Sequence, residues 1–173
     1  MRRFAHGDTA AFEELYRRYE RPVYSFCLRL LGDPDRAQDA FQEAFIRVVD
    51  GRENYRSQGR FRSWLFTIAR HACADQARDA SRFSLDRGEA QDAASQSAGA
   101  GAEGRVAARD ELDRVLTLLP REQREVVLLS RYYGFSYGEI ADLTGSTEAA
   151  VKQKAYRALK TLRAALSVQE EEG

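Results

Sequence analysis

The chain has 173 residues and a formal net charge of zero, and 43% of its residues are hydrophobic and 31% charged. This much apolar material can build a core, so the composition excludes wholesale disorder, and the length allows one ordinary domain or two small ones. No apolar run approaches the roughly 18 residues that a membrane helix needs, and the charged first residues lack the apolar stretch of a secretory signal. Two cysteines are too few for a disulfide framework, so we expect a protein of the reducing cytoplasm.

The first half of the chain reads as a series of helices, because apolar residues recur there at spacings of three and four. One helix is expected over residues 10–31, where Pro22 should bend it or begin a new turn. Residues 32–35 form a break followed by a helix start, and a second apolar face covers residues 37–48. The exposed side of this second helix carries a polar row of Asp39, Gln42, Glu43 and Arg47. Alone, such a row is most often a solvated helix face.

Residues 51–59 are polar and read as a loop, and a further amphipathic helix is expected from Phe61 to about Arg78. The loop and the helix interleave aromatic residues with arginines. This composition suits single-stranded nucleic acid, because cations meet phosphates and rings meet unstacked bases. The candidate residues are Asn54, Tyr55, Arg56, Arg60, Arg62, Arg70 and His71. The spacing of Phe61, Trp64 and Ile68, in contrast, favours a place in the core.

The helical pattern breaks between Ser84 and Gly104, where Leu85 is the one large apolar residue in a stretch of mostly small and polar residues. Such a stretch cannot bury enough surface to offset the cost of ordering it, which predicts a flexible linker over residues 83–105. The linker separates an N-terminal domain, residues 1–82, from a C-terminal domain, residues 106–173. Since no segment shows the sustained alternation of a strand, we predict an all-α fold of two small helical domains.

The second domain opens with an apolar stripe that ends at Pro120, a residue that suits the first turn of a following helix. Residues 136–151 then have the spacing of a helix-turn-helix. Ala141 is small where the two helices would cross, and Gly145 suits a left-handed turn. Val151 falls where an apolar residue must pack back onto the first helix. A second helix of this kind enters the major groove of duplex DNA.

Thr147 is placed to cap that second helix. The side chains expected to point away from its apolar face are Glu148, Lys152, Gln153, Tyr156, Arg157 and Lys160. Lys and Arg suit phosphates and guanine edges, and Gln suits adenine. Together with the basic residues between positions 60 and 82, this helix gives the chain two places that could meet a polyanion. The alternative is an ordinary helical hairpin with a solvated face.

In this order, the segments resemble bacterial RNA polymerase sigma factors of the extracytoplasmic-function (ECF) group. The resemblance covers nearly the whole chain. It is carried by residues 12–16 (FEELY), 39–45 (DAFQEAF) and 61–70 (FRSWLFTIAR), similar to sigma region 2, and by residues 119–127 (LPREQREVV) and 135–141 (FSYGEIA), similar to region 4. Either block alone is weak, but the two joined by a linker form a highly specific combination.

The resemblance implies a role for each block in promoter-specific transcription initiation. The row Asp39, Gln42, Glu43 and Arg47 would dock on the clamp coiled coil of the largest subunit of core RNA polymerase. The candidates between Asn54 and His71 would hold the non-template strand of the minus-ten element, with one base leaving the stack. Those between Thr147 and Lys160 would read the minus-thirty-five element as duplex. An anti-sigma factor is a further expected partner.

Two residues depart from the family pattern: His71 stands where members often carry Asn, and Gln153 where they often carry Ser. Both departures concern residues expected near DNA bases, so either change can alter base preference.

Other classes of function fit less well. His71 and Cys73 are too sparse for a zinc site, and the chain has no phosphate-binding glycine loop or nucleophile elbow, so we expect no enzyme, cofactor or metal. Cys27 and Cys73 both lie on apolar helix faces, which favours buried structural thiols. The main alternative is a stand-alone helix-turn-helix regulator with an N-terminal ligand-sensing or dimerisation domain. The second alternative is a protein that only binds other proteins and whose helices are basic by chance.

Overall fold

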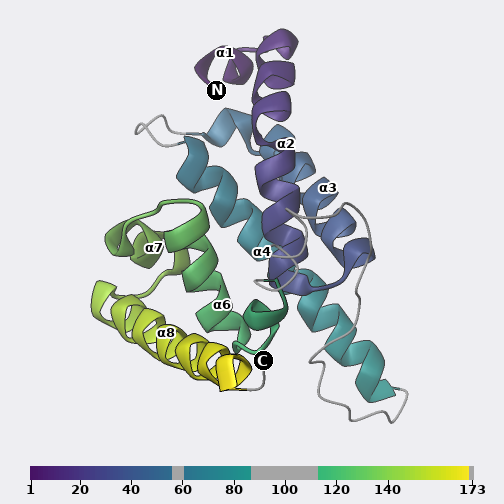
Figure 1. Ribbon diagram of the computed structural model, residues 1–173. Helices are drawn as coiled ribbons and strands as arrows, with labels where there is room; N and C mark the ends of the chain where they lie inside the picture. Colours follow the sequence, from purple (N-terminus) through teal and green to yellow (C-terminus); the bar gives the residue numbers. More distant parts are fainter. Residues whose placement is uncertain (56–60, 87–112, 172–173) are drawn as a thin grey trace. The chain divides into compact units, whose positions relative to one another are not determined.

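The computed structural model describes residues 1–55, 61–86 and 113–171 (Figure 1). Within these ranges the chain forms helices and turns and no strand, which confirms the all-α fold. The chain divides into two compact units, Met1–Asp92 and Ala93–Gly173, and each is described by itself. A search of the described residues finds no helix both long enough and apolar enough to cross a bilayer.

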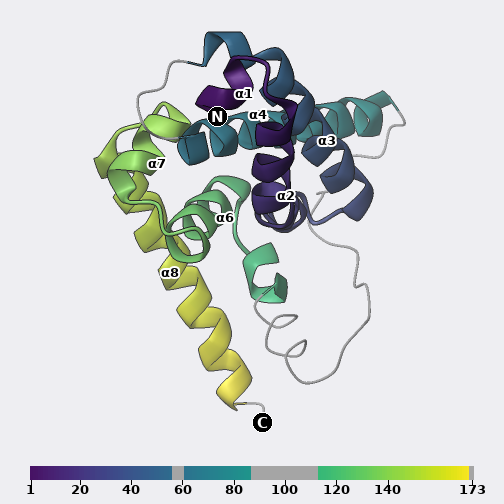
Figure 2. The same ribbon diagram turned by 90° about the horizontal axis from the view of Figure 1, so that it is seen from above.

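The first unit is a bundle of three long helices: α2 (Thr9–Leu31), α3 (Pro34–Asp50) and α4 (Phe61–Asp86). Two short elements accompany them, the helix α1 (Arg2–Ala5) and the 3-10 turn η1 (Arg52–Asn54). Each long helix packs against the other two (Figures 1 and 2). Their facing sides form the core, whose fully buried members include Val23, Phe26, Cys27, Ala44, Val48, Leu65, Phe66, Ala69 and Cys73.

Short-range signals set the ends of α2 and α3. The Asp8 carboxylate accepts the Ala11 backbone N–H at 3.1 Å and so caps α2, and Gly32 ends that helix with a φ of 71°. Asp33 caps α3 in the same way. Pro22 does not begin a new helix, one of the two alternatives expected: it lies inside α2, which runs from Thr9 to Leu31 as one helix. Packing of α2 against α3 and α4 offsets the backbone hydrogen bond that a proline removes.

Two further features of the first unit differ from the sequence-based expectation. Helix α1 was not expected; it forms because Phe4 is buried against Phe12, with ring centroids 4.9 Å apart. Helix α4 continues past residue 78 to Asp86, because the chain offers no Gly or Pro before Gly88. It therefore covers the first residues of the predicted linker, and residues 87–105 of that linker lie outside the described residues.

The second unit contains a helical turn at residues 113–117, α6 (Arg121–Val127), the π-helical turn η2 (Leu128–Tyr132), α7 (Tyr137–Thr144) and α8 (Glu148–Glu171). Pro120 precedes α6 directly. Helix α8 packs against both α6 and α7 (Figure 2). The core of the unit includes Leu116, Leu119, Leu128, Leu129, Ile140, Val151 and Ala158.

The turn between α7 and α8 confirms the predicted helix-turn-helix. Gly145 ends α7 in the left-handed conformation, with a φ of 63°. The Thr147 hydroxyl accepts the Ala150 backbone N–H at 3.2 Å at the start of α8. The start of α7 carries a capping box that the sequence analysis missed, in which the side chains of Ser136 and Glu139 each accept the other residue's backbone N–H.

Candidate polymerase and nucleic-acid interfaces

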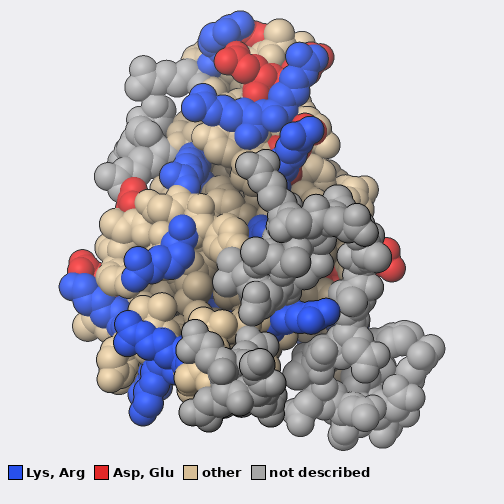
Figure 3. All heavy atoms as spheres, viewed as in Figure 1, with Lys and Arg blue, Asp and Glu red and all other residues tan. Residues whose placement is uncertain are grey.

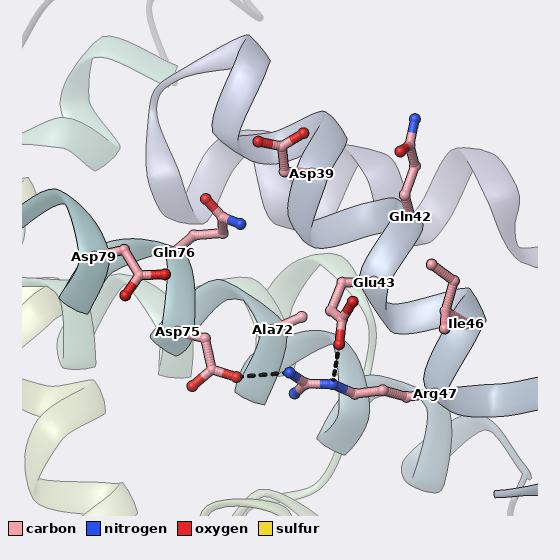
Figure 4. Close-up of a pocket in the computed structure, with 9 residues that line it drawn as sticks. All are labelled: Asp39, Gln42, Glu43, Ile46, Arg47, Ala72, Asp75, Gln76 and Asp79. Carbon is pink, nitrogen blue, oxygen red and sulfur yellow. Dashed lines mark hydrogen bonds and ion pairs between the residues drawn. The ribbon is translucent and has the colours of Figure 1, made fainter. Parts of the chain in front are cut away.

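The polar row of α3 lines a groove between α3 and α4 of about 350 Å³ (Figure 4). From α3 come the four predicted residues and Ile46, and from α4 come Ala72, Asp75, Gln76 and Asp79. Asp39 and Gln42 are exposed, and Glu43 and Arg47 are half-buried. Ile46 is 54% exposed, although it is a large apolar side chain. The structure therefore brings the four predicted residues to one surface and adds an apolar residue among them.

Arg47 is held from both walls of this groove. Its Nε donates to Glu43 Oε1 at 2.7 Å within α3, and its Nη2 donates to Asp75 Oδ2 at 2.8 Å on α4 (Figure 4). Asp75 also pairs with Arg78 through its other carboxylate oxygen. The hydrogen bond from Arg47 is the main cause that lowers the pKa of Asp75, and the same bond raises the pKa of Arg47. The four side chains thus form a network of ion pairs that joins the two helices.

Four half-buried rings gather where α4 begins, and we call Tyr19, Tyr55, Phe61 and Trp64 the aromatic cluster. Ring centroids lie 5.0 Å apart for Tyr55 and Trp64, and 5.4 Å apart for Tyr19 and Phe61. Phe61 and Trp64 are therefore neither fully in the core, as their spacing favoured, nor fully exposed. The rings keep part of their surface open to solvent.

Gly51 leaves room for this cluster. A Cβ at Gly51 would lie 3.2 Å from Trp64 Cζ2 and 2.9 Å from the Arg47 backbone oxygen, closer than side chains normally pack. The absence of a side chain at position 51 therefore lets the indole lie against the end of α3.

The predicted minus-ten residues fall into three groups. Arg62 and His71 are exposed on α4, Arg70 is half-buried there, and Tyr55 belongs to the aromatic cluster. Asn54 ends η1, and Arg56 and Arg60 lie outside the described residues. Partial burial is the main cause that lowers the pKa of His71, and the nearby charge of Arg70 acts in the same direction. The imidazole is therefore neutral near pH 7 and can both donate and accept a hydrogen bond.

Helix α8 presents two unlike faces. Val151, Ala155 and Ala158 are buried against the unit. The outer face exposes every predicted minus-thirty-five residue: Thr147, Glu148, Lys152, Gln153, Tyr156, Arg157 and Lys160. Tyr156 is 70% exposed. Within the part of the chain that the structure describes, Lys152 pairs with Glu148 at 2.6 Å, and no hydrogen bond or ion pair engages the side chains of Gln153, Arg157 or Lys160.

The two cysteines lie in the core of the first unit. Cys27 and Cys73 are both free and fully buried, as predicted. A hydrogen bond that the Cys27 thiol donates to the neighbouring Cys73 and the burial together raise the pKa of Cys27, so this thiol is not a ready nucleophile. Among the described residues, no group of three His, Cys, Asp or Glu side chains is arranged to hold a metal ion.

Comparison with known proteins identifies the family of both units. The family model "Sigma-70 region 2" matches residues 15–83, and "Sigma-70, region 4" matches residues 109–162. The RNA polymerase sigma factor CarQ of Myxococcus xanthus is 32% identical over 163 residues, which cover 94% of this chain and 93% of CarQ. The chain belongs to the sigma-70 family. Within it, the names of further relatives assign this sigma factor to the ECF group.

Among those relatives, the ECF sigma factor SigL of Mycobacterium tuberculosis is 32% identical and covers 94% of the chain and 92% of its own length. BldN of Streptomyces coelicolor is 35% identical over 90% of the chain and 60% of its own length. Two solved structures share the fold. RpoE of Bartonella quintana, in complex with the anti-sigma factor NepR, has a TM-score of 0.80 at 24% identity, covering 91% of this chain and 98% of its own. CnrH, in complex with the cytosolic domain of CnrY, has a TM-score of 0.68 at 23% identity, covering 95% and 92%.

Membership in this family settles the broad function. The protein is a sigma factor that works with core RNA polymerase and promoter DNA in transcription initiation. A stand-alone helix-turn-helix regulator is not favoured, because the N-terminal half matches region 2 rather than a ligand-sensing or dimerisation domain.

Sequence reasoning missed five residues of the α3–α4 groove, namely Ile46 of α3 and the four that α4 contributes. Ile46 follows Gln42 by four positions and Glu43 by three, so helical periodicity alone would have placed it on the polar row. Asp75 gave no such signal, because it meets Arg47 from another helix, 28 residues further along the chain.

Proposed function

We propose that the row Asp39, Gln42 and Glu43, with Ile46 beside it, docks this sigma factor on the clamp coiled coil of core RNA polymerase. The observation that carries this proposal is the exposed apolar side chain inside a polar groove. Interfaces commonly place an apolar anchor among polar groups that fix its register. A basic helical segment with an apolar side chain over Ile46 is the partner that such a groove fits.

In the same proposal, the first turns of α4 hold the non-template strand of the minus-ten element. The aromatic cluster offers ring surface to unstacked bases, and Arg62 supplies a cation for the backbone. His71 lies further along α4 and is neutral near pH 7, so it can hydrogen-bond a base edge. The cost of unstacking a base, a few kcal/mol, is offset by these contacts.

The outer face of α8 then reads the minus-thirty-five element in the major groove. Gln153 and Arg157 project from it without a partner of their own among the described residues and can meet base edges and phosphates. Figure 3 shows exposed Lys and Arg side chains over the described residues of each unit, and such cations suit the phosphates of nucleic acid.

The protein supplies binding and orientation and no reaction of its own: sigma factors are initiation factors, and polymerase performs the chemistry. Because polymerase and promoter lie in the bacterial cytoplasm, we expect this sigma factor to act there. We further infer an anti-sigma factor as a regulatory partner. The structure of RpoE, which shares this fold, was solved with an anti-sigma factor bound, which supports the inference.

The docking assignment is tested with the variant Asp39→Ala with Glu43→Ala. We expect its affinity for core polymerase to fall by about tenfold or more, with run-off transcription lost in parallel, because centrally placed interface residues carry most of the binding energy. The matched control, Glu13→Ala with Glu14→Ala, removes two exposed carboxylates from α2 and should bind normally. Unchanged affinity of the α3 variant would overturn the assignment.

A further inference from the structure

The strongest unexplained feature of the groove is the double engagement of Arg47. Its guanidinium spans from α3 to α4, with Glu43 on one side and Asp75 on the other (Figure 4). A guanidinium is a rigid planar fork, so two simultaneous charge-assisted hydrogen bonds fix its orientation. Arg78 on the next turn of α4 binds Asp75 as well, which orients that carboxylate in turn.

These contacts leave Arg47 poorly placed to act as a polymerase contact. Two of its donor groups are already used, and a partner that took them would leave Glu43 without its counter-charge and Asp75 with Arg78 alone. Asp39, Gln42 and Ile46, in contrast, are exposed on the same face of α3. Asp39, Gln42 and Ile46 are therefore accessible to polymerase, whereas Arg47 is already bound by carboxylates of this chain.

We propose that Arg47 is a positioning residue, anchored by Asp75 of α4, which holds the Glu43 carboxylate in place and fixes α3 against α4 beneath the docking row. The proposal rests on the proposed function, since it concerns the same surface. It assigns Asp75 a role in polymerase binding that its position on the DNA-binding helix does not suggest.

Loss of the anchor should act on binding more than on folding. All three side chains are between 33% and 43% exposed, and ion pairs of that exposure add little to stability. A released Arg47, however, could fold over the groove and pair with the carboxylates that polymerase needs. The docking row would then be partly masked in a chain that is still folded.

The test compares Asp75 with Asp50, an exposed carboxylate at the end of α3 that does not line the groove. Among the described residues, the ion pairs of Arg47 are with Glu43 and Asp75. We expect Asp75→Asn to weaken core-polymerase binding by roughly three- to tenfold and Asp50→Asn to leave it unchanged within twofold. Equal affinities of the two variants would mean that the positioning role is wrong.

A double-mutant cycle with Arg47→Gln gives the second readout. Asp75→Asn should cause no further loss of affinity in the Arg47→Gln background, because that variant already lacks the ion pair between Arg47 and Asp75. Losses that multiply would mean that Arg47 contacts polymerase directly, which overturns the proposal. NMR titration of the free protein checks the ion pair between Arg47 and Asp75. In Arg47→Gln, the lowered pKa of Asp75 should return toward its ordinary value.

The outcomes separate this inference from the docking assignment. If Asp39→Ala with Glu43→Ala abolishes binding and Asp75→Asn does not weaken it, only the positioning role fails. If neither variant weakens binding, the docking surface itself is misplaced. Near-native thermal unfolding of each variant, followed by the fluorescence of Trp64, the one tryptophan of the chain, confirms that affinities are compared between folded proteins.

Discussion

Two lysines of α8, separated by one residue, have different surroundings. Lys152 lies on the outer face of the helix with Gln153 and Arg157. Lys154 points to the other side and pairs with Glu122 of α6 at 2.6 Å. A basic side chain in a recognition helix is therefore not by itself a DNA contact, since Lys154 instead ties α8 to the helix behind it.

This difference predicts unequal effects of removing two cations from one helix. Arg157→Ala should cost about 1–3 kcal/mol of promoter binding, measured as run-off transcription by the holoenzyme on minus-thirty-five promoters. Lys154→Ala is the matched control and should keep promoter choice, with a loss of folding stability below about 1 kcal/mol. Equal promoter defects in both variants would contradict the assignment of the outer face.

The lowered pKa of His71 predicts that the free energy of unfolding depends on pH. Burial lowers its pKa below the ordinary 6.5 in the folded chain, so the unfolded chain binds more protons between the two values, and stability rises with pH across that window. The stabilisation that neutral His71 contributes is fully present above the pKa of His71 in the unfolded chain. It is lost as the pH falls through the lower pKa of His71 in the folded chain. Urea unfolding at about pH 7.5 and about pH 5 should therefore show a smaller difference for His71→Gln than for the wild type.

The other histidine supplies the control for this experiment. His6→Gln should retain the wild-type difference between the two pH values, since His6 lies on the exposed turn after α1 and not on α4. If His71→Gln retains the full difference, other groups cause the pH dependence.

At the scale of elements, capping residues close in sequence decide where several helices begin. Asp8, Asp33 and Ser136 each cap the helix that follows them, within three residues in the sequence. The 26-residue length of α4, in contrast, exceeds what its apolar spacing predicted. The contact between the end of α3 and the start of α4 depends on Gly51, which allows Trp64 to approach.

Gly51→Ala tests this contact. The added Cβ must displace either the indole or the last turn of α3, so we expect a loss of about 1–3 kcal/mol in the free energy of unfolding and a shift in tryptophan fluorescence. Gly138→Ala, in α7, is the contrasting substitution. Its Cβ would lie 3.6 Å from Glu148 Oε2, an ordinary contact, and it should be tolerated. An unchanged unfolding midpoint for Gly51→Ala would show that the cluster adapts freely.

At the scale of the whole molecule, the surfaces that we propose as interfaces are divided between two compact units. The α3 row and the aromatic cluster belong to the first unit, and the α8 face belongs to the second. This organisation suits an adaptor, because each half can meet its own target while the chain supplies the connection.

Separate interfaces predict independent defects. Asp39→Ala and Arg157→Ala share no contact among the described residues, so their free-energy losses should add, and the fold-losses in transcription at limiting sigma factor should multiply. Run-off transcription with the two single variants and the double variant measures this directly. If the double variant transcribes as well as the more defective of the two single variants, the two interfaces act as a unit.

By itself, the sequence determined the all-α class, the starts of α2, α3 and α8, the turn at Gly145 and the exposed rows on α3 and α8. These features follow from residues within about one helical turn of one another, where periodicity and capping act. Only the tertiary structure decided that Asp75 anchors Arg47, that Lys154 belongs to Glu122, and that Trp64 lies over Gly51. Each of those contacts joins residues far apart in the chain, and which of them meet depends on how whole helices cross, a property that no local pattern encodes.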